Sequence, residues 1–156
     1  MSETAGWGFL PLALLLLSLL TAGLTLHLRG RWKRAQTDRI APRAGGDGVP
    51  LVAAFSGWKG MPWISFASSD LAPSLILHAD HLACRVLKTR RKPYAAVSRV
   101  DYRETVATTN IVLEFSDSPV SFTGNTANRD TARAAIRRLA EQGCPLSPRA
   151  QDLVRG

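Results

Sequence analysis

The sequence TNIVLEFSDSPVSFTGN, residues 109–125, decides the fold of most of this chain. Apolar residues occupy every second position in 111–115, which is the period of a half-buried β-strand. The turn-forming residues 116–119 follow, and a second apolar alternation runs through 120–122. We therefore predict an antiparallel hairpin that ends near Gly124.

An amphipathic helix is predicted directly after this hairpin. Candidate capping residues at Asn125, Thr126 and Asn128 mark its start, and Gly143 and Pro145 mark its end. Four apolar residues between these limits recur at helical spacing and predict a buried face: Ala132, Ala135, Ile136 and Leu139. Residues 144–156 are then expected to form a flexible tail.

Further strands are predicted on the N-terminal side of the hairpin. Residues 75–78 and 81–87 alternate around a short turn, and residues 96–104 form the next strand. The basic sequence KTRRKP at 88–93 is expected to be a loop. The sequence before residue 75 gives a mixed signal, so the predicted domain spans 51–143 with its first strands undefined.

The apolar sequence WGFLPLALLLLSLLTAGLTLHL at 7–28 carries no formal charge. As a helix it would rise roughly 33 Å, enough to cross a hydrocarbon core of about 30 Å. We therefore predict a transmembrane helix at 7–28, with a tail at 1–6 before it and a basic, Gly- and Pro-rich linker at 29–50 after it. The alternatives are a cleaved signal peptide, which normally has its basic residues in front, and a buried core helix.

Basic residues directly after the apolar segment predict its orientation. The positive-inside rule places the N-terminus outside and the C-terminal domain in the cytoplasm, as in a single-pass protein of the cell inner membrane. In that compartment Cys84 and Cys144 stay reduced, whereas in the reverse orientation they could form a disulfide. The predicted juxtamembrane anchor has four members: Arg29, Arg31, Lys33 and Arg34.

The net charge of +8 is distributed unevenly. Residues 29–47 carry six basic and two acidic side chains, so about half of the excess charge lies beside the apolar segment. A basic chain can bind nucleic acid, but anionic lipid explains this part of the charge. The remaining basic residues are interspersed with acidic ones, and we therefore predict no nucleic-acid partner.

The densest basic run outside the anchor lies in the loop predicted at 88–93. Two interpretations stay open for it, a solvated loop or a contact with anionic lipid or an acidic protein partner. Its four basic residues are Lys88, Arg90, Arg91 and Lys92.

Motifs for catalysis or cofactor binding are absent from the sequence. It contains no G-x-S-x-G, P-loop or H-E-x-x-H pattern. The segment HADHLAC at 78–84 offers metal-ligating residue types, but its spacing matches no standard site. We expect a non-enzymatic protein with no catalytic residues, no cofactor and no metal.

The predicted helix is preceded by three segments with the pattern of short strands: LILHADHLACRVL, YAAVSRVDYRE and TNIVLEFSDSPVSFTGN. With that helix, residues 63–143 resemble a bacterial pleckstrin-homology-like (PH-like) domain. The resemblance implies a mainly-β domain, with a curled antiparallel sheet or barrel of about seven strands capped by one C-terminal α-helix. An α+β sandwich and an open sheet with one helix are the alternatives.

The expected function combines the apolar segment with this domain. We expect a membrane-anchored, non-enzymatic protein that presents a cytosolic PH-like module. The module would recruit or regulate another membrane-proximal protein through a sheet edge or the loops at the rim. The alternative is a module that senses anionic lipid through the basic loop at 88–92, because PH domains in general use such a loop for phosphoinositide headgroups.

Overall fold

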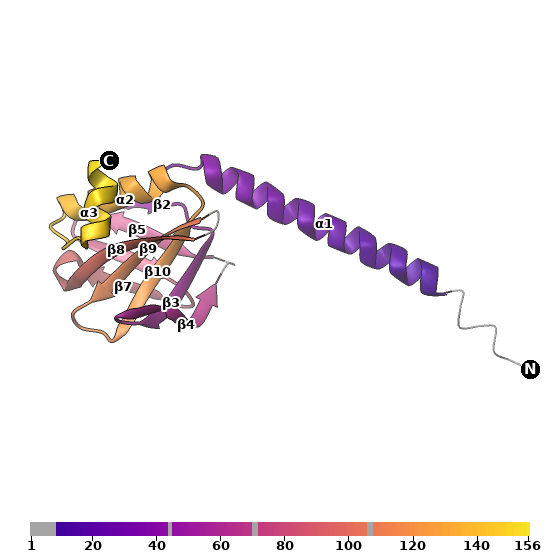
Figure 1. Cartoon of the computed structure of the whole chain (residues 1–156), viewed down its shortest axis with the longest axis horizontal. Helices are drawn as coiled ribbons and strands as arrows, with labels where there is room; N and C mark the ends of the chain where they lie inside the picture. Colours follow the sequence, from indigo (N-terminus) through magenta and orange to yellow (C-terminus); the bar gives the residue numbers. More distant parts are fainter. Residues whose placement is uncertain (1–8, 44, 70–71, 106–107) are drawn as a thin grey trace, which may run out of the picture. The chain divides into compact units, whose positions relative to one another are not determined.

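The computed structural model describes the backbone of residues 9–43, 45–69, 72–105 and 108–156. The chain divides into two compact units, Met1–Arg34 and Ala35–Gly156. Most of helix α1 (Phe9–Thr37) belongs to the first unit, and the second contains the described strands (Figure 1). The predicted tail at 1–6 and the start of the predicted span, Trp7 and Gly8, lie outside the described residues.

Helix α1 runs through both the apolar segment and the basic residues that follow it. Its hydroxyl side chains, among them Ser18 and Thr21, donate hydrogen bonds to carbonyls in the preceding turn. Within the described part of the chain, no helix is both long enough and apolar enough to cross a membrane. This finding contradicts the predicted transmembrane helix at 7–28 and the single-pass, inner-membrane localisation derived from it.

The second unit contains two five-stranded antiparallel sheets (Figure 1). Their strand orders are β1-β2-β5-β6-β7 in sheet A and β4-β3-β10-β9-β8 in sheet B. Sheet A consists of β1 (Ala41–Arg43), β2 (Gly46–Val49), β5 (Ser74–His78), β6 (His81–Arg85) and β7 (Thr89–Pro93). Sheet B consists of β3 (Ala53–Trp58), β4 (Met61–Ser69), β8 (Val97–Thr105), β9 (Thr108–Phe115) and β10 (Val120–Thr126).

This architecture corrects the predicted curled sheet or barrel of about seven strands. The described residues form ten strands, and each sheet is open, with an edge strand on either side. Strands β5, β6, β8, β9 and β10 form where apolar alternation predicted them. Among the additional strands, β1, β2 and β7 have no such alternation, because they are rich in glycine, proline or basic residues.

Two helices, not one, follow the strands. Helix α2 (Arg129–Glu141) begins at its cap Asn128, whose side chain accepts a hydrogen bond from the amide of Asp130. It ends before Gly143, whose φ of +80° is readily adopted by glycine. Helix α3 (Pro148–Arg155) lies in the segment that was expected to be a flexible tail, and its Ala150 and Leu153 are buried.

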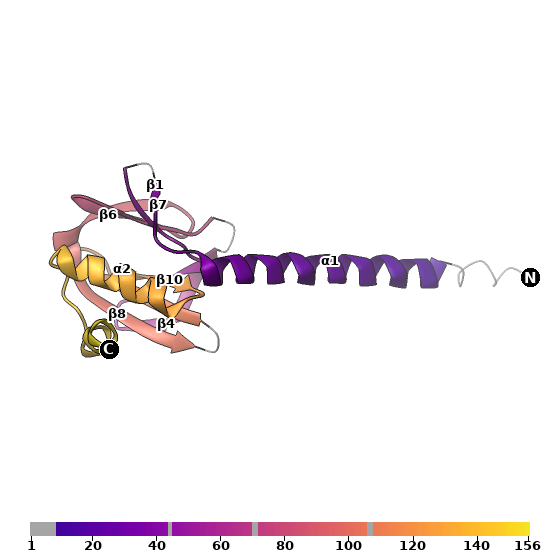
Figure 2. The same cartoon turned by 90° about the horizontal axis from the view of Figure 1, so that it is seen from above.

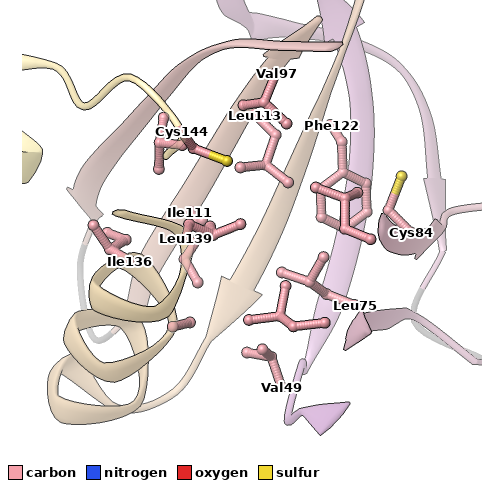
Figure 3. Packing of buried hydrophobic residues seen from close by; sticks show 14 of the residues in the cluster. Val49, Leu75, Cys84, Val97, Ile111, Leu113, Phe122, Ile136, Leu139 and Cys144 are labelled. Atoms are coloured by element: carbon pink, nitrogen blue, oxygen red, sulfur yellow. The ribbon is translucent and has the colours of Figure 1, made fainter. Parts of the chain in front are cut away.

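The hydrophobic core lies between the two sheets and α2. Figure 2 shows α2 along the opening between the sheets. Its residues Ile136 and Leu139 are fully buried and share one cluster with Leu75 of sheet A and Leu113 of sheet B, as Figure 3 shows. The predicted apolar face of this helix is therefore confirmed, and it closes one side of the sandwich.

The segment between α2 and α3 covers an edge of sheet B. The amide of Val100 in β8 donates to the carbonyl of Pro145 at 2.7 Å, and the amide of Ser147 donates to the carbonyl of Val100 at 2.8 Å. Leu146 thus forms a parallel bridge with β8. Backbone groups that an edge strand would otherwise leave open are satisfied by this contact.

Candidate functional site

A cluster of exposed apolar side chains lies on the hairpin formed by β3 and β4. Four large residues, here named the β3–β4 surface, are about half exposed: Trp58 (48%), Met61 (45%), Ile64 (47%) and Phe66 (53%). The rings of Trp58 and Phe66 are in contact, with centroids 5.5 Å apart, and Trp58 pairs with Met61 across the hairpin. Exposed apolar residues that cluster in this way are typical of a binding surface.

The β3–β4 turn is held against the rest of sheet B. The amide of Lys59 donates to the carbonyl of Pro119 at 2.7 Å, and its ammonium donates to the carbonyl of Phe115 at 3.0 Å. The amide of Gly60 donates to the carboxylate of Glu114 at 3.1 Å. These contacts fix the turn, so the apolar side chains stand on a positioned scaffold and a partner need not order them.

The two sheets have four edge strands, and β4 is the one that is long, apolar and uncovered. Strand β8 is covered at Val100, and β1 is only three residues long. Strand β7 carries arginine and lysine residues, which discourage pairing with another chain. Strand β4 is nine residues long, and its pairing with β3 is irregular on both sides of Gly57.

The predicted basic loop at 88–92 is mostly a strand, and its side chains do not form one surface. Arg90, Arg91 and Lys92 belong to β7, where successive side chains point to opposite faces of the sheet. Arg91 therefore lies on the other face from Arg90 and Lys92. Lys88 precedes the strand and is exposed.

Lys92 already has partners within the domain. Its ammonium lies 2.6 Å from the Asp117 carboxylate and 5.6 Å from the centre of the Phe115 ring. The hydrogen bond from Lys92 lowers the pKa of Asp117 below its usual value. Because this charge is paired, Lys92 is less available to a lipid headgroup than the sequence suggests.

The predicted anchor residues lie on helix α1. Arg29 is exposed, and Lys33 is also exposed but takes part in an interaction within the chain. The side chains of Arg31 and Arg34 lie outside the described residues. The anchor role predicted for these four basic residues depended on the membrane span, which the structure contradicts.

A cleft opens beside the β3–β4 surface, with a volume of about 350 Å³. Phe115, Phe122, Val86 and Cys84 form its buried floor. Its exposed rim carries Phe66, Leu87, Lys88 and Arg90. Sequence reasoning missed this cleft, because its lining comes from five strands or their ends and only folding brings them together.

The two cysteines are separate buried thiols. The core residues Leu113 and Phe122 lie between them in Figure 3, so the disulfide considered for the reverse orientation does not form. Burial raises the pKa of each thiol to about 11. Such thiols are poor nucleophiles at neutral pH.

The segment HADHLAC does not gather its side chains into one site. His78 and His81 stack with ring centroids 4.3 Å apart, and His81 Nδ1 lies 2.7 Å from Asp80. Cys84 lines the cleft instead. Within the described residues, no group of three or more histidine, cysteine, aspartate or glutamate side chains could hold a metal ion.

The β3–β4 surface was only partly visible in the sequence. The alternation in WISFAS at 63–68 predicts a strand with Trp63 and Phe66 as its large residues, but nothing in the pattern indicates that Ile64 and Met61 stay exposed. The side chain of Trp63 lies outside the described ones. A comparison with protein-family models and with curated proteins gave no match, so the resemblance to PH-like domains stays a prediction.

Proposed function

We propose that residues 35–156 form a non-enzymatic protein-recruitment module whose docking site is the β3–β4 surface. The observation that carries this proposal is the group of four half-exposed apolar side chains on the β3–β4 hairpin, three of which lie on the long edge strand β4 of sheet B. The occupant we propose is an extended apolar segment of a protein partner.

Hydrophobic burial supports this occupant. Covering apolar surface contributes roughly 25 cal/mol for each Å² removed from water. Tryptophan is also among the residue types that contribute most at protein interfaces, and Trp58 is held in place by its contact with Phe66. A folded turn that already presents these groups reduces the entropy lost on binding.

The open backbone of β4 supports a protein rather than a small molecule. An edge strand offers unpaired amide and carbonyl groups, which an extended peptide can satisfy while its side chains contact the apolar residues. The irregular pairing of β4 with β3 leaves additional backbone positions without a strand partner. The open backbone and three of the four apolar side chains lie on the same strand, β4.

The test uses the full chain with a photo-crosslinking residue at Met61. We expect Met61 to crosslink a protein partner and expect Ile64→Asp to abolish this product, because a charge then faces the apolar contact. Thr89→Asp places the same charge on the exposed strand β7 and should leave the product unchanged.

The crosslinked partner is then purified and its affinity measured directly. We expect Ile64→Asp to weaken binding at least about tenfold, and Trp58→Ala to weaken it by a similar factor. Equal affinity for the wild type and both variants would overturn the proposal. A crosslink only to a second copy of this chain would overturn it as well, since the surface would then be a self-association contact.

A further inference from the structure

We propose that the cleft beside the β3–β4 surface binds an anionic amphiphile, a single apolar chain that ends in a carboxylate. This site goes beyond the recruitment surface, with which the cleft shares Phe66. Its volume of about 350 Å³ lies at the lower end of the range for small-molecule sites, which is about 300–1,000 Å³.

The floor of the cleft suits an apolar chain. Phe115 and Phe122 are almost fully buried, and Val86 and Cys84 complete the floor. The polar floor residue Ser121 directs its hydroxyl to the carbonyl of Trp58 at 3.5 Å. An apolar ligand would therefore displace water from a surface that offers that water few hydrogen bonds.

No acidic side chain lines the cleft among the described residues. Cys84 is the titratable acid on the floor, and burial raises its pKa to about 11, so the thiol is neutral at physiological pH. A ligand that carries a negative charge consequently meets no like charge inside. This argues against a cationic occupant, which would find no counter-charge there.

The rim supplies the complementary charge. Lys88 and Arg90 are both exposed at the mouth, and neither forms an ion pair with any described residue. The neighbouring Lys92 is paired with Asp117, and Lys88 and Arg90 are the basic residues among the described side chains that line the cleft. A guanidinium binds a carboxylate in bidentate geometry, so Arg90 is well suited to hold the head group.

The exposed apolar residues on the rim extend the binding surface. Leu87 is 66% exposed, the largest exposure among the large apolar side chains that the structure describes in residues 35–156, and Phe66 lies on the same rim. Both would contact the part of the chain next to the carboxylate. The cleft is apolar at its floor and cationic at its mouth. A fatty carboxylate has the matching order, an apolar chain that ends in a negative charge.

The test measures how fast N-ethylmaleimide modifies the two cysteines of the full chain, with decanoate as the probe. Cys84 lines the cleft, whereas Cys144 is buried elsewhere and serves as the internal control. We expect decanoate to slow modification of Cys84 in a saturable way, by about fivefold or more, and to leave Cys144 unchanged. Mass spectrometry of the peptides separates the two rates.

Charge variants then test the head group. In Lys88→Gln/Arg90→Gln the decanoate concentration for half-protection should rise about tenfold, because the carboxylate loses both cations. Arg91→Gln, on the opposite face of β7, is the matched control and should behave as the wild type. Decanol should protect more weakly than decanoate, and the double substitution should not alter its effect.

Three outcomes would overturn the proposal. Decanoate that protects neither cysteine shows that the cleft is not a site, and equal protection of Cys84 and Cys144 shows only general stabilisation. If decanoate protects Cys84 equally well in Lys88→Gln/Arg90→Gln and in the wild type, the two cations do not bind the carboxylate. Calorimetric titration of decanoate into the wild type and the double variant provides a second measurement, and the Met61 crosslink tests the recruitment surface independently.

Discussion

The hydroxyl of Ser147 donates a hydrogen bond of 2.5 Å to the carboxylate of Asp101. Ser147 is also the cap of α3, where its oxygen accepts from the amide of Ala150 at 3.2 Å. Asp101 is buried in β8 and accepts from the amide of Tyr102 at 2.9 Å. One serine therefore joins the start of the last helix to the edge of sheet B.

Removing this hydroxyl should destabilise the docked helix. Ser147→Ala deletes the helix cap and leaves the buried carboxylate of Asp101 with one donor fewer, so we expect the free energy of unfolding to fall by about 1–3 kcal/mol. Chemical denaturation of the second unit measures the change. Ser68→Ala, at an exposed position of β4, should change stability by no more than about 0.5 kcal/mol.

The apolar face of α2 should be essential for folding. Leu139 is fully buried in the hydrophobic core, and Leu139→Ala leaves a cavity that lowers the free energy of unfolding by about 2–5 kcal/mol. Thermal unfolding monitored by circular dichroism detects the loss. Arg137→Ala on the exposed face of the same helix is the control, and a loss of similar size there would contradict the packing described.

Stability should fall in alkaline solution because of Cys84. Its thiol has a usual pKa of 9.0 and a pKa of about 11 in the folded protein. Between these two values the unfolded chain loses the proton and the folded chain keeps it, so the free energy of unfolding decreases as pH rises. The contribution approaches about 3 kcal/mol above pH 11, at 1.36 kcal/mol for each unit of pKa.

Cys84→Ala provides the comparison for this pH dependence. The variant lacks the titrating group, so its stability should decline less between pH 9 and pH 11 than that of the wild type, whatever its stability at pH 7. Denaturation midpoints at several pH values measure both curves. Parallel curves would show that the thiol does not stay protonated in the fold.

The β3–β4 turn should depend on Gly60. Its φ is +80°, where a side chain is strained even though a Cβ would meet nothing within 4 Å. Gly60→Ala should therefore lower stability by about 1–2 kcal/mol and weaken partner binding through the displaced Met61. Nuclear magnetic resonance of the amides in the turn would report the change, and unaltered spectra would argue against this conformation.

Sequence patterns predicted the position of an element where its core residues recur at the period of that element. Helix α2 buries one face, so its apolar residues recur at helical spacing. Strands β9 and β10 are buried on both faces, which corrects the half-buried strand predicted at 111–115, but their core residues Ile111, Leu113 and Phe115 still alternate. Hydrophobic periodicity did not predict β7. Its residues Arg90, Arg91 and Lys92 point to alternate faces of the sheet, but all three are basic, so the sequence shows no alternation of apolar and polar residues. An edge strand of charged residues looks like a loop when the sequence is considered alone.

The missed features depend on contacts distant in sequence. Strand β2 is held by its pairing with β5, which leaves no local pattern. Helix α3 has a local start signal, the cap Ser147 followed by a proline, but its contact with Asp101 of β8 is distant in sequence. The candidate site has the same character, since Phe66 and Arg90 border one cleft from different sheets. The membrane prediction rested on the apolar segment and its basic flank, and it did not anticipate that one helix continues through the basic residues to Thr37.

The contact of Leu146 with β8 has a consequence for assembly. A sheet with two free edges can add strands without limit and so grow into a fibre. Sheet B is blocked at Val100 by the chain's own C-terminal segment, which leaves growth possible only from β4. If two copies paired edge to edge through sheet B, each would use its β4 edge. No uncovered edge of sheet B would then remain for a third copy.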